Sequence, residues 1–187
     1  MNSSFFSSSN SQSVSKMKNR NFSIQMENNG CNKLHIKQNL NEIRVALISF
    51  NIKKILSLLR EVYYDGKIVN GIKEGFSKVV YDNGMIYEGW LRNGKKEGEG
   101  KYILNEVVIF EGNFSNDSIE GQGNLRFFKY FALSSFPCPK LLQNASYFGT
   151  FSSNQFSGMG TVFLNEKEKI VSKFTRGEPS GELTFYT

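Results

Sequence analysis

Gly89, Gly94 and Lys95 are the nearest approach to a ligand-binding motif in this chain of 187 residues. Their spacing reproduces most of the phosphate-binding loop, in which backbone N–H groups cradle phosphates and the lysine reaches them. Lys96 stands where that loop requires a serine or threonine hydroxyl to hold the metal ion. The segment is also predicted to be a hairpin, not a turn from a strand into a helix. We therefore predict no nucleotide site here.

Metal-ligating and acidic residues give little support for catalysis. Cys31 and the single histidine, His35, have a spacing that could share a metal ion on a helix, but two ligands do not complete a site. Glu97, Glu99 and Glu120 lie beside predicted turns on a polar face, where we expect them to be solvated. We predict no catalytic residue, no metal site and no cofactor.

A unit of 23 residues recurs through the second two-thirds of the chain, and this unit must position whatever the protein binds. Tyr87-x-Gly89 is followed by a turn and then by Gly98-x-Gly100, and five copies of this frame are present. A fixed short period indicates stacked supersecondary units, none of which can bury its apolar face alone.

Each unit is predicted to be a β-hairpin. One aligned column holds residue types that tolerate a left-handed backbone, which indicates a turn. The predicted turns lie near Asn70-Gly71, Asn93-Gly94, Asn116-Asp117, Asn154 and Arg176-Gly177. On either side of the turn, aromatic residues and glycines share one parity and polar residues the other. The predicted fold is mainly β: an elongated single antiparallel sheet of stacked hairpins, with one N-terminal amphipathic helix.

The glycines of each unit are predicted to make room for aromatic rings. A ring from a neighbouring strand can lie flat only where the facing residue has no side chain. We expect Gly98 and Gly121 to face such rings, so that valine at either position destabilises the fold strongly. Polar residues such as Glu88, Lys101 and Glu111 have the opposite parity. One face of the sheet should therefore be aromatic and the other wet.

This frame resembles the MORN repeat (membrane occupation and recognition nexus). The resemblance covers roughly residues 62 to 187 and is closest in the second unit. The end units depart from the pattern, because Ser77 and Leu183 replace the second glycine, Ser172 replaces the first, and Pro179 lies in the last hairpin. Atypical ends are expected where a stack of repeats stops.

The resemblance implies a non-catalytic scaffold or adaptor that binds another protein in a cytoskeletal, ciliary or membrane-associated assembly of the cytoplasm. Two alternatives stay open. One is a peripheral module that binds anionic phospholipid. The other is an accessory subunit of an enzyme complex, including a mitochondrial one if the N-terminus is a transit signal.

We expect the partner to be a peptide or helix in an aromatic groove, or a second copy of the chain. The groove residues predicted to contact it are Tyr87, Trp90, Phe110, Phe114, Tyr147 and Phe151. The competing interpretation is that these rings form the core beneath the helix and an apolar insertion.

Three segments are predicted: a flexible basic Ser/Asn-rich tail over residues 1–38, an amphipathic helix over 39–62, and five repeats over 63–187 with an apolar insertion at about 129–142. The helix carries a heptad seam of apolar residues, namely Val45, Ile48, Ile52, Ile55, Leu59 and Val62. This seam either docks on the apolar face of the first hairpins or pairs with a partner helix. The insertion either folds back over the sheet or reaches for a partner.

Positive charge is concentrated before the repeats. Residues 1–61 hold nine Lys/Arg and three Glu, whereas residues 62–187 hold fourteen of each sign. Because anionic membranes attract clustered cations, we assign any membrane affinity to Lys16, Lys18, Arg20, Lys53, Lys54 and Arg60. No stacked basic and aromatic pattern supports nucleic-acid binding. Two cysteines cannot form a disulfide framework, which indicates a reducing compartment.

Overall fold

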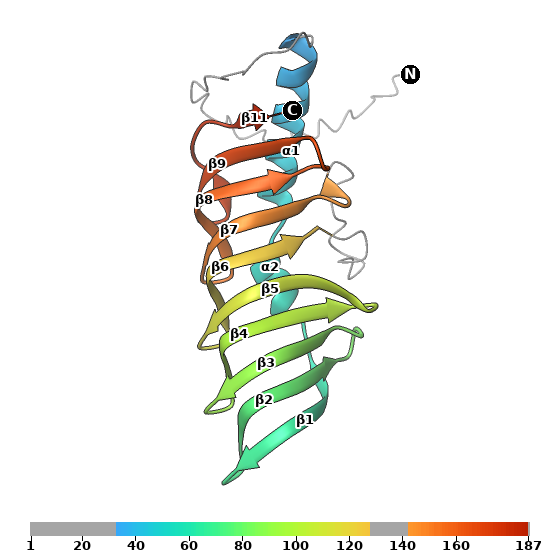
Figure 1. Ribbon diagram of the computed structural model, residues 1–187, viewed down its shortest axis with the longest axis vertical. Coiled ribbons are helices and arrows are strands. Elements are labelled where there is room, and N and C mark those ends of the chain that lie inside the picture. The colour runs from blue at the N-terminus through green and yellow to red at the C-terminus, as the bar shows by residue number, and fades with distance from the viewer. Residues whose placement is uncertain (1–32, 128–141, 187) are drawn as a thin grey trace, which may run out of the picture.

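The computed structural model describes residues 33–127 and 142–186, which form one antiparallel sheet with two helices. The eleven strands in this part of the chain are hydrogen-bonded in chain order from β1 to β10, and β11 pairs with β9 beside β10. Figure 1 shows the strands stacked like rungs along the long axis, with the helices running along that axis behind them. This confirms the predicted elongated sheet of stacked hairpins.

The helices are α1 (Lys33–Ser49) and α2 (Ile52–Leu56). The strands are β1 (Glu61–Val69), β2 (Ile72–Tyr81), β3 (Ile86–Arg92), β4 (Lys95–Leu104), β5 (Val107–Ser115), β6 (Ser118–Arg126), β7 (Ser146–Ser152), β8 (Gln155–Phe163), β9 (Lys169–Thr175), β10 (Glu178–Pro179) and β11 (Thr184–Tyr186). The face of the sheet on the side of the helices is called the covered face below, and the opposite one is called the open face.

The hairpin of each repeat unit turns through two successive residues with a left-handed backbone, as the turn column predicts. The pairs are Asn70–Gly71, Asn93–Gly94, Asn116–Asp117, Ser153–Asn154 and Arg176–Gly177, with φ between 50° and 84°. Two left-handed residues in succession twist the chain in the sense that matches the right-handed twist of the flanking strands. Local backbone preference accounts for the turns that begin with asparagine, whereas Ser153 and Arg176 adopt the left-handed backbone without such a preference.

Glycines face one another across neighbouring strands and make room for aromatic rings. Gly100 lies opposite Gly112, and Gly123 lies opposite Gly149. A Cβ atom added at Gly100 would lie 2.7 Å from the ring of Tyr87. These rings can lie flat on the covered face only because the strands beneath them carry hydrogen atoms there.

The predicted environment of Gly98 and Gly121 is wrong. A Cβ atom added at Gly98 would meet no atom within 4 Å, and one at Gly121 would meet only Asn113 at 3.9 Å. Both glycines have a left-handed backbone, with φ of 73° and 74°. The reason is a β-bulge, in which Glu97, Gly98 and Glu99 together lie opposite Trp90 and Gly98 supplies the left-handed residue.

The covered face carries a continuous row of buried rings along the long axis. Neighbouring rings pack edge to face, with centroid distances of 5.1 Å between Tyr87 and Phe114, 5.4 Å between Phe110 and Phe151, and 5.3 Å between Tyr147 and Phe151. This geometry is the favoured one for aromatic pairs. The open face carries mainly polar side chains, so the predicted difference between the two faces is confirmed.

The predicted heptad seam of the helix is correct at Ile52 and Ile55, which are buried, but it is wrong in α1 and at its last position. Val45 is 65% exposed, and Val62 is 63% exposed and lies in β1 rather than in a helix. The chain leaves the helical conformation at Phe50 and Asn51, and the Asn51 side chain accepts a hydrogen bond of 2.9 Å from the Lys54 N–H at the start of α2. A break of two residues resets the helical phase. The buried positions of α1 and α2 are Leu40, Ile43, Ala46, Leu47, Ile52 and Ile55.

The helices dock on the later hairpins, and not on the first ones as predicted. The Phe50 ring lies 4.9 Å from that of Phe127 and 6.2 Å from that of Phe156. Arg44 donates a hydrogen bond of 3.2 Å from Nη2 to the carbonyl oxygen of Pro179 in β10. Of the two interpretations of the helix, docking on the sheet is the one that the structure shows.

The boundaries of the predicted tail and insertion are only partly covered by the described residues. The last six residues of the predicted tail, 33–38, belong to α1. The remainder of the tail and nearly all of the insertion lie outside the described ranges, and Leu142 at the end of the insertion is fully buried. Within the described ranges, no helix has the length and apolar character needed to cross a membrane.

Candidate functional site

Five of the six predicted groove residues are core and cannot contact a partner. Their exposed fractions are between 0% and 2%, and they are Tyr87, Phe110, Phe114, Tyr147 and Phe151. Because the facing glycines have no side chains, these rings lie flat on the strands, and the neighbouring rings cover them. The prediction that they form an exposed groove is therefore wrong, and the competing interpretation as core is correct for these five.

Two of the buried rings carry hydroxyl groups that are satisfied within the sheet. The Tyr87 hydroxyl donates to the carbonyl oxygen of Trp90, and the Tyr147 hydroxyl donates to that of Thr150, each over 3.0 Å. Burial raises the pKa of both phenols well above the usual value. These groups stay protonated and act as structural donors at the bulges.

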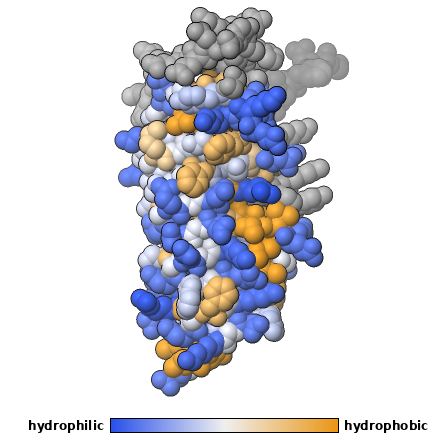
Figure 2. Space-filling model, viewed as in Figure 1, coloured by the Kyte–Doolittle hydropathy of each residue, from blue (hydrophilic) through white to orange (hydrophobic). Residues whose placement is uncertain are grey.

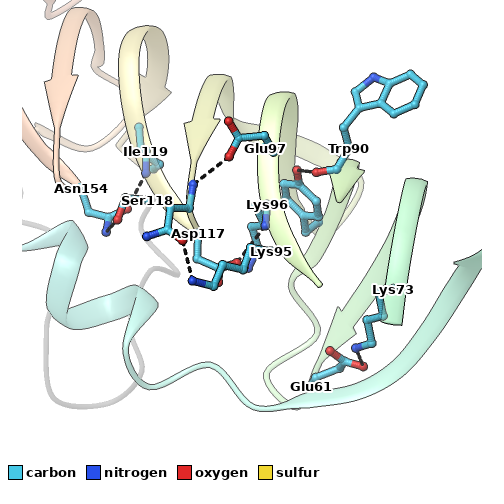
Figure 3. A network of polar contacts seen from close by, with 12 residues as sticks. Glu61, Lys73, Trp90, Lys95, Lys96, Glu97, Asp117, Ser118, Ile119 and Asn154 are labelled. Carbon is cyan, nitrogen blue, oxygen red and sulfur yellow. Dashed lines mark hydrogen bonds and ion pairs between the residues drawn. The ribbon is translucent and has the colours of Figure 1, made fainter. Parts of the chain in front are cut away.

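Trp90, the sixth predicted residue, lies on the open face and is 53% exposed. It is the single residue that opposes the β4 bulge, between Gly89 and Leu91. Phe76, which is 61% exposed, packs against its edge with a centroid distance of 5.9 Å. Figure 3 shows the Trp90 side chain projecting away from the surrounding polar contacts. Two large rings are thus presented to solvent side by side.

A hollow of about 350 Å³ lies beside this aromatic pair on the open face. The charged residues that line it are Glu88, Glu99, Lys101 and Glu111. Lys101 forms an ion pair of 3.1 Å with Glu88, which leaves the lining with an excess of carboxylates. Figure 2 shows that this face is predominantly hydrophilic, with apolar side chains gathered in separate patches.

A second hollow of about 300 Å³ lies on the other side of Trp90, toward the hairpin turns. Its charged lining residues are Glu74, Arg92 and Glu97. Trp90 therefore stands between two hollows whose linings together hold five carboxylates and two cations. The repeat region as a whole is balanced in charge, so the linings of these two hollows are more acidic than the region to which they belong.

A ladder of hydrogen bonds near the turns joins the hairpins of the first four repeat units to one another. The Glu97 carboxylate accepts a hydrogen bond of 3.0 Å from the Asn116 N–H, and the Asp117 carboxylate accepts one of 2.9 Å from the Lys96 N–H (Figure 3). Glu74 and Glu120 accept from the next turns in the same way, at 2.8 Å and 2.6 Å. The prediction that Glu97 and Glu120 are merely solvated is wrong.

The sequence does contain a signal for this ladder. A glutamate precedes the left-handed glycine of the bulge in three successive units, at Glu74-Gly75, Glu97-Gly98 and Glu120-Gly121. Sequence reasoning missed it because the acceptor's partner belongs to the following hairpin, and the registry between hairpins is not visible in a single unit.

Comparison with family models finds the MORN repeat at residues 87–105, 110–129 and 147–162. These ranges start at the first strands of the second, third and fourth hairpins, where the facing glycines and the row of rings are most regular. The chain is a MORN-repeat protein. A search of curated proteins finds no match to it.

Replacing Glu97 by alanine should lower the free energy of unfolding of this MORN-repeat protein by about 1 kcal/mol, because the Asn116 N–H loses its acceptor. Urea denaturation followed by circular dichroism measures the loss. Glu99→Ala is the matched control: it removes an exposed carboxylate two residues away on the open face, and a change within about 0.5 kcal/mol is expected. Equal losses in the two variants would show that the ladder contributes nothing.

The residues that resemble a phosphate-binding loop belong to the second hairpin, within the MORN repeat at residues 87–105. Lys95 begins β4 directly after the β3–β4 turn, and the Lys96 ammonium group lies 3.6 Å from the Asp117 carboxylate and over the Tyr87 ring at 5.3 Å. Cys31 lies outside the described residues, and His35 lies in α1. Among the described residues, no cluster of ligating side chains suits a metal ion.

The predicted membrane-contacting cations are partly within the described residues. Lys53 and Lys54 are exposed on α2, and the exposed Arg60 forms an ion pair of 3.5 Å with Asp82. Lys16, Lys18 and Arg20 lie outside the described residues. Membrane association through these cations stays a prediction.

Proposed function

We propose that this MORN-repeat protein is a non-catalytic scaffold that binds another protein through the open face of its sheet, at Phe76 and Trp90. MORN repeats are typical of scaffold and membrane-associated proteins, and the family is generally non-catalytic. The observation that carries the proposal is the pair of exposed rings between two acidic hollows. A cytoplasmic assembly of cytoskeletal, ciliary or membrane-associated type is the setting that we propose for it.

The exposed rings of Phe76 and Trp90 are of the residue type that is common at the centre of protein–protein interfaces. Tryptophan is among the residues that dominate binding energy when a partner covers them, and surrounding polar residues then exclude water. Trp90 has about half of its surface exposed, and the hollows on both sides give a partner's side chains room to pack against its two faces.

The charge of the hollows indicates the chemistry of the partner. Five carboxylates against two cations favour a positively charged segment. A guanidinium or ammonium group over the face of a tryptophan gains about 0.5–1 kcal/mol at an exposed site. An arginine placed in the larger hollow can contact the Trp90 ring and the Glu99 or Glu111 carboxylate together. We therefore propose a partner segment in which arginine or lysine alternates with apolar residues.

Fluorescence offers a direct test, because Trp90 is the only tryptophan of the chain. Titration with an extended peptide in which arginine alternates with valine should change the emission of Trp90 in a saturable way, and added salt should weaken the change. A peptide with glutamate at the arginine positions is the matched control and should leave the emission unaltered. No response to the arginine peptide would overturn the cationic partner.

Substitutions of residues that line the larger hollow test whether the peptide binds there. Glu99→Gln combined with Glu111→Gln should weaken binding of the arginine peptide by about twofold to fivefold for each carboxylate, since an exposed ion pair contributes up to about 1 kcal/mol. Glu166→Gln, at an exposed turn position between β8 and β9, removes the same charge away from the hollow and should have no effect.

A further inference from the structure

The two edges of the sheet differ in strand length and in cover. The edge formed by β10 and β11 is called the far end below, and the edge formed by β1 is called the near end. At the far end, β10 has two residues and β11 has three, and α1 packs beside them. Short strands and a covering helix are the usual protection of a sheet edge. At the near end, β1 has nine residues, and within the described part of the chain no strand pairs with its outer edge.

Apolar side chains are concentrated at the unprotected end. The exposed ones on β1 and at the start of β2 have exposed fractions between 39% and 63%, and they are Val62, Tyr63, Ile68, Val69 and Ile72. A long, apolar edge strand is a template for pairing with another chain. This end of the sheet therefore has the composition of an interface.

The first strand of each later repeat unit pairs with a preceding strand, and β1 has no such partner among the described residues. On the equivalent edge, β3, β5, β7 and β9 each pair with the preceding strand over five or six successive residues without a bulge. In every case a small residue faces a small residue: Gly89 faces Ser77, Gly112 faces Gly100, Gly149 faces Gly123, and Ser172 faces Gly160. Gly66 is the equivalent residue of β1 by the period of 23.

A row of alternating charges on the open face also ends at β1. Across successive strands the Cα partners are Asp65, Lys78, Glu88, Lys101 and Glu111. Opposite charges at facing positions stabilise neighbouring strands, and like charges destabilise them. A strand added at the free edge of β1 would continue this alternation if it placed a cation opposite Asp65.

We propose that two copies of this chain pair antiparallel along β1, with Gly66 opposite Gly66 of the partner subunit. This register continues the rule that a small residue faces a small residue. It places Asp65 opposite Lys67 of the partner subunit, and Lys67 opposite the partner's Asp65, so each row of charges continues. It also places Tyr64 opposite the partner's Ile68 and Tyr63 opposite the partner's Val69, which covers the exposed apolar side chains.

Neighbouring registers are less favourable. A pairing centred on Asp65 sets two aspartates against each other, and one centred on Lys67 sets two lysines against each other. A shift by a single residue would place the open face of one copy beside the covered face of the other, because successive side chains point to opposite faces. The two-fold arrangement on Gly66 joins two sheets into one continuous sheet with both open faces on the same side.

Sedimentation velocity of the full chain tests the pairing. An interface made by one strand edge is small, so the association should depend on concentration. Over about a hundredfold range of concentration, the mass should rise from 21.3 kDa toward twice that value. A mass that stays at 21.3 kDa throughout overturns the proposal.

Charge swaps test the register. Asp65→Lys or Lys67→Asp alone should each weaken self-association by about tenfold, because both facing pairs become like-charged. An equimolar mixture of the two variants should associate again, since the lysines of one variant face the aspartates of the other. No stronger association in the mixture than in the separate variants overturns the register.

Controls separate the edge from general charge effects and from unfolding. Glu166→Lys and Lys167→Asp make the same charge changes at exposed turn positions and should leave association unaltered. Circular dichroism checks that each variant is folded, because Lys78 lies opposite Asp65 within the hairpin. If Asp65→Lys loses its fold, Asp65→Asn takes its place, with an expected weakening of about threefold. Unaltered association of that folded variant overturns the proposal.

Discussion

Replacing Gly112 by alanine should lower the free energy of unfolding by about 3 kcal/mol, the upper part of the range for overpacking a tight core. The added Cβ atom would lie 2.8 Å from the carbonyl oxygen of Gln122, the Cα of Gly123 and the Phe110 ring. Two of these three neighbours are backbone atoms of the adjoining strand, and the Phe110 ring is 1% exposed. The two backbone atoms cannot move aside without separating β5 from β6, and the Phe110 ring packs against the rings of Phe114 and Phe151.

Gly121→Ala in the next strand is the matched control. Its Cβ atom would enter open space, with Asn113 at 3.9 Å as the nearest neighbour, but the backbone has a φ of 74°. Holding an L-residue in the left-handed region costs about 1–2 kcal/mol. Urea denaturation of both variants should rank Gly112→Ala as clearly the more damaging one. If the ranking is reversed, the rings do not depend on the facing glycines.

The turns and the two faces of the sheet were predictable because their causes are local. Asn93 and Gly94 adopt a left-handed backbone more readily than other residue types, so a turn column is visible in the sequence without knowledge of the fold. Alternation of aromatic and polar residues follows from the geometry of one strand. Both signals are repeated in five units, which separates them from chance.

The difference in exposure between Tyr87 and Trp90 could have been predicted from the sequence, but the predicted groove placed both rings on one surface. Tyr87 and Trp90 are both aromatic and lie within one strand, but they point to opposite faces. Parity distinguishes them, since Tyr87 shares its parity with Gly89 and Leu91, whereas Trp90 shares its own with Glu88. The parity of each single residue therefore separates the ring of the core from the ring of the open face.

The phase of the helix depended on tertiary packing. The apolar residues of α1 and α2 satisfy more than one seam, and the observed seam is selected by contact with the rings of Phe127 and Phe156 far along the chain. Asn51 gave a local signal, because asparagine is a favoured first cap of a helix, and it marks the break before α2. No comparable local signal indicates on which hairpins the helix docks.

Replacing Leu47 by alanine should lower the free energy of unfolding by about 3 kcal/mol, within the usual range for removing a fully buried leucine side chain from a core. Leu47 is 0% exposed on the face of α1 that packs against the sheet. The loss should appear in a urea titration followed by circular dichroism, as a lower midpoint with the same final unfolded signal.

Val45→Ala, two residues away on the same helix, is the control that decides the phase. Val45 is 65% exposed, and alanine favours the helix slightly more than valine does, so stability should be unchanged or a few tenths of a kcal/mol higher. The heptad seam predicted from sequence requires the opposite order, because it places Val45 in the interface and leaves Leu47 outside it. A larger loss from Val45→Ala than from Leu47→Ala would therefore restore that seam and contradict the observed docking of α1. Losses from Leu47→Ala alone would establish that the covered face of the MORN sheet depends on this helix for its cover, which leaves the open face and the β1 edge as the surfaces for partners.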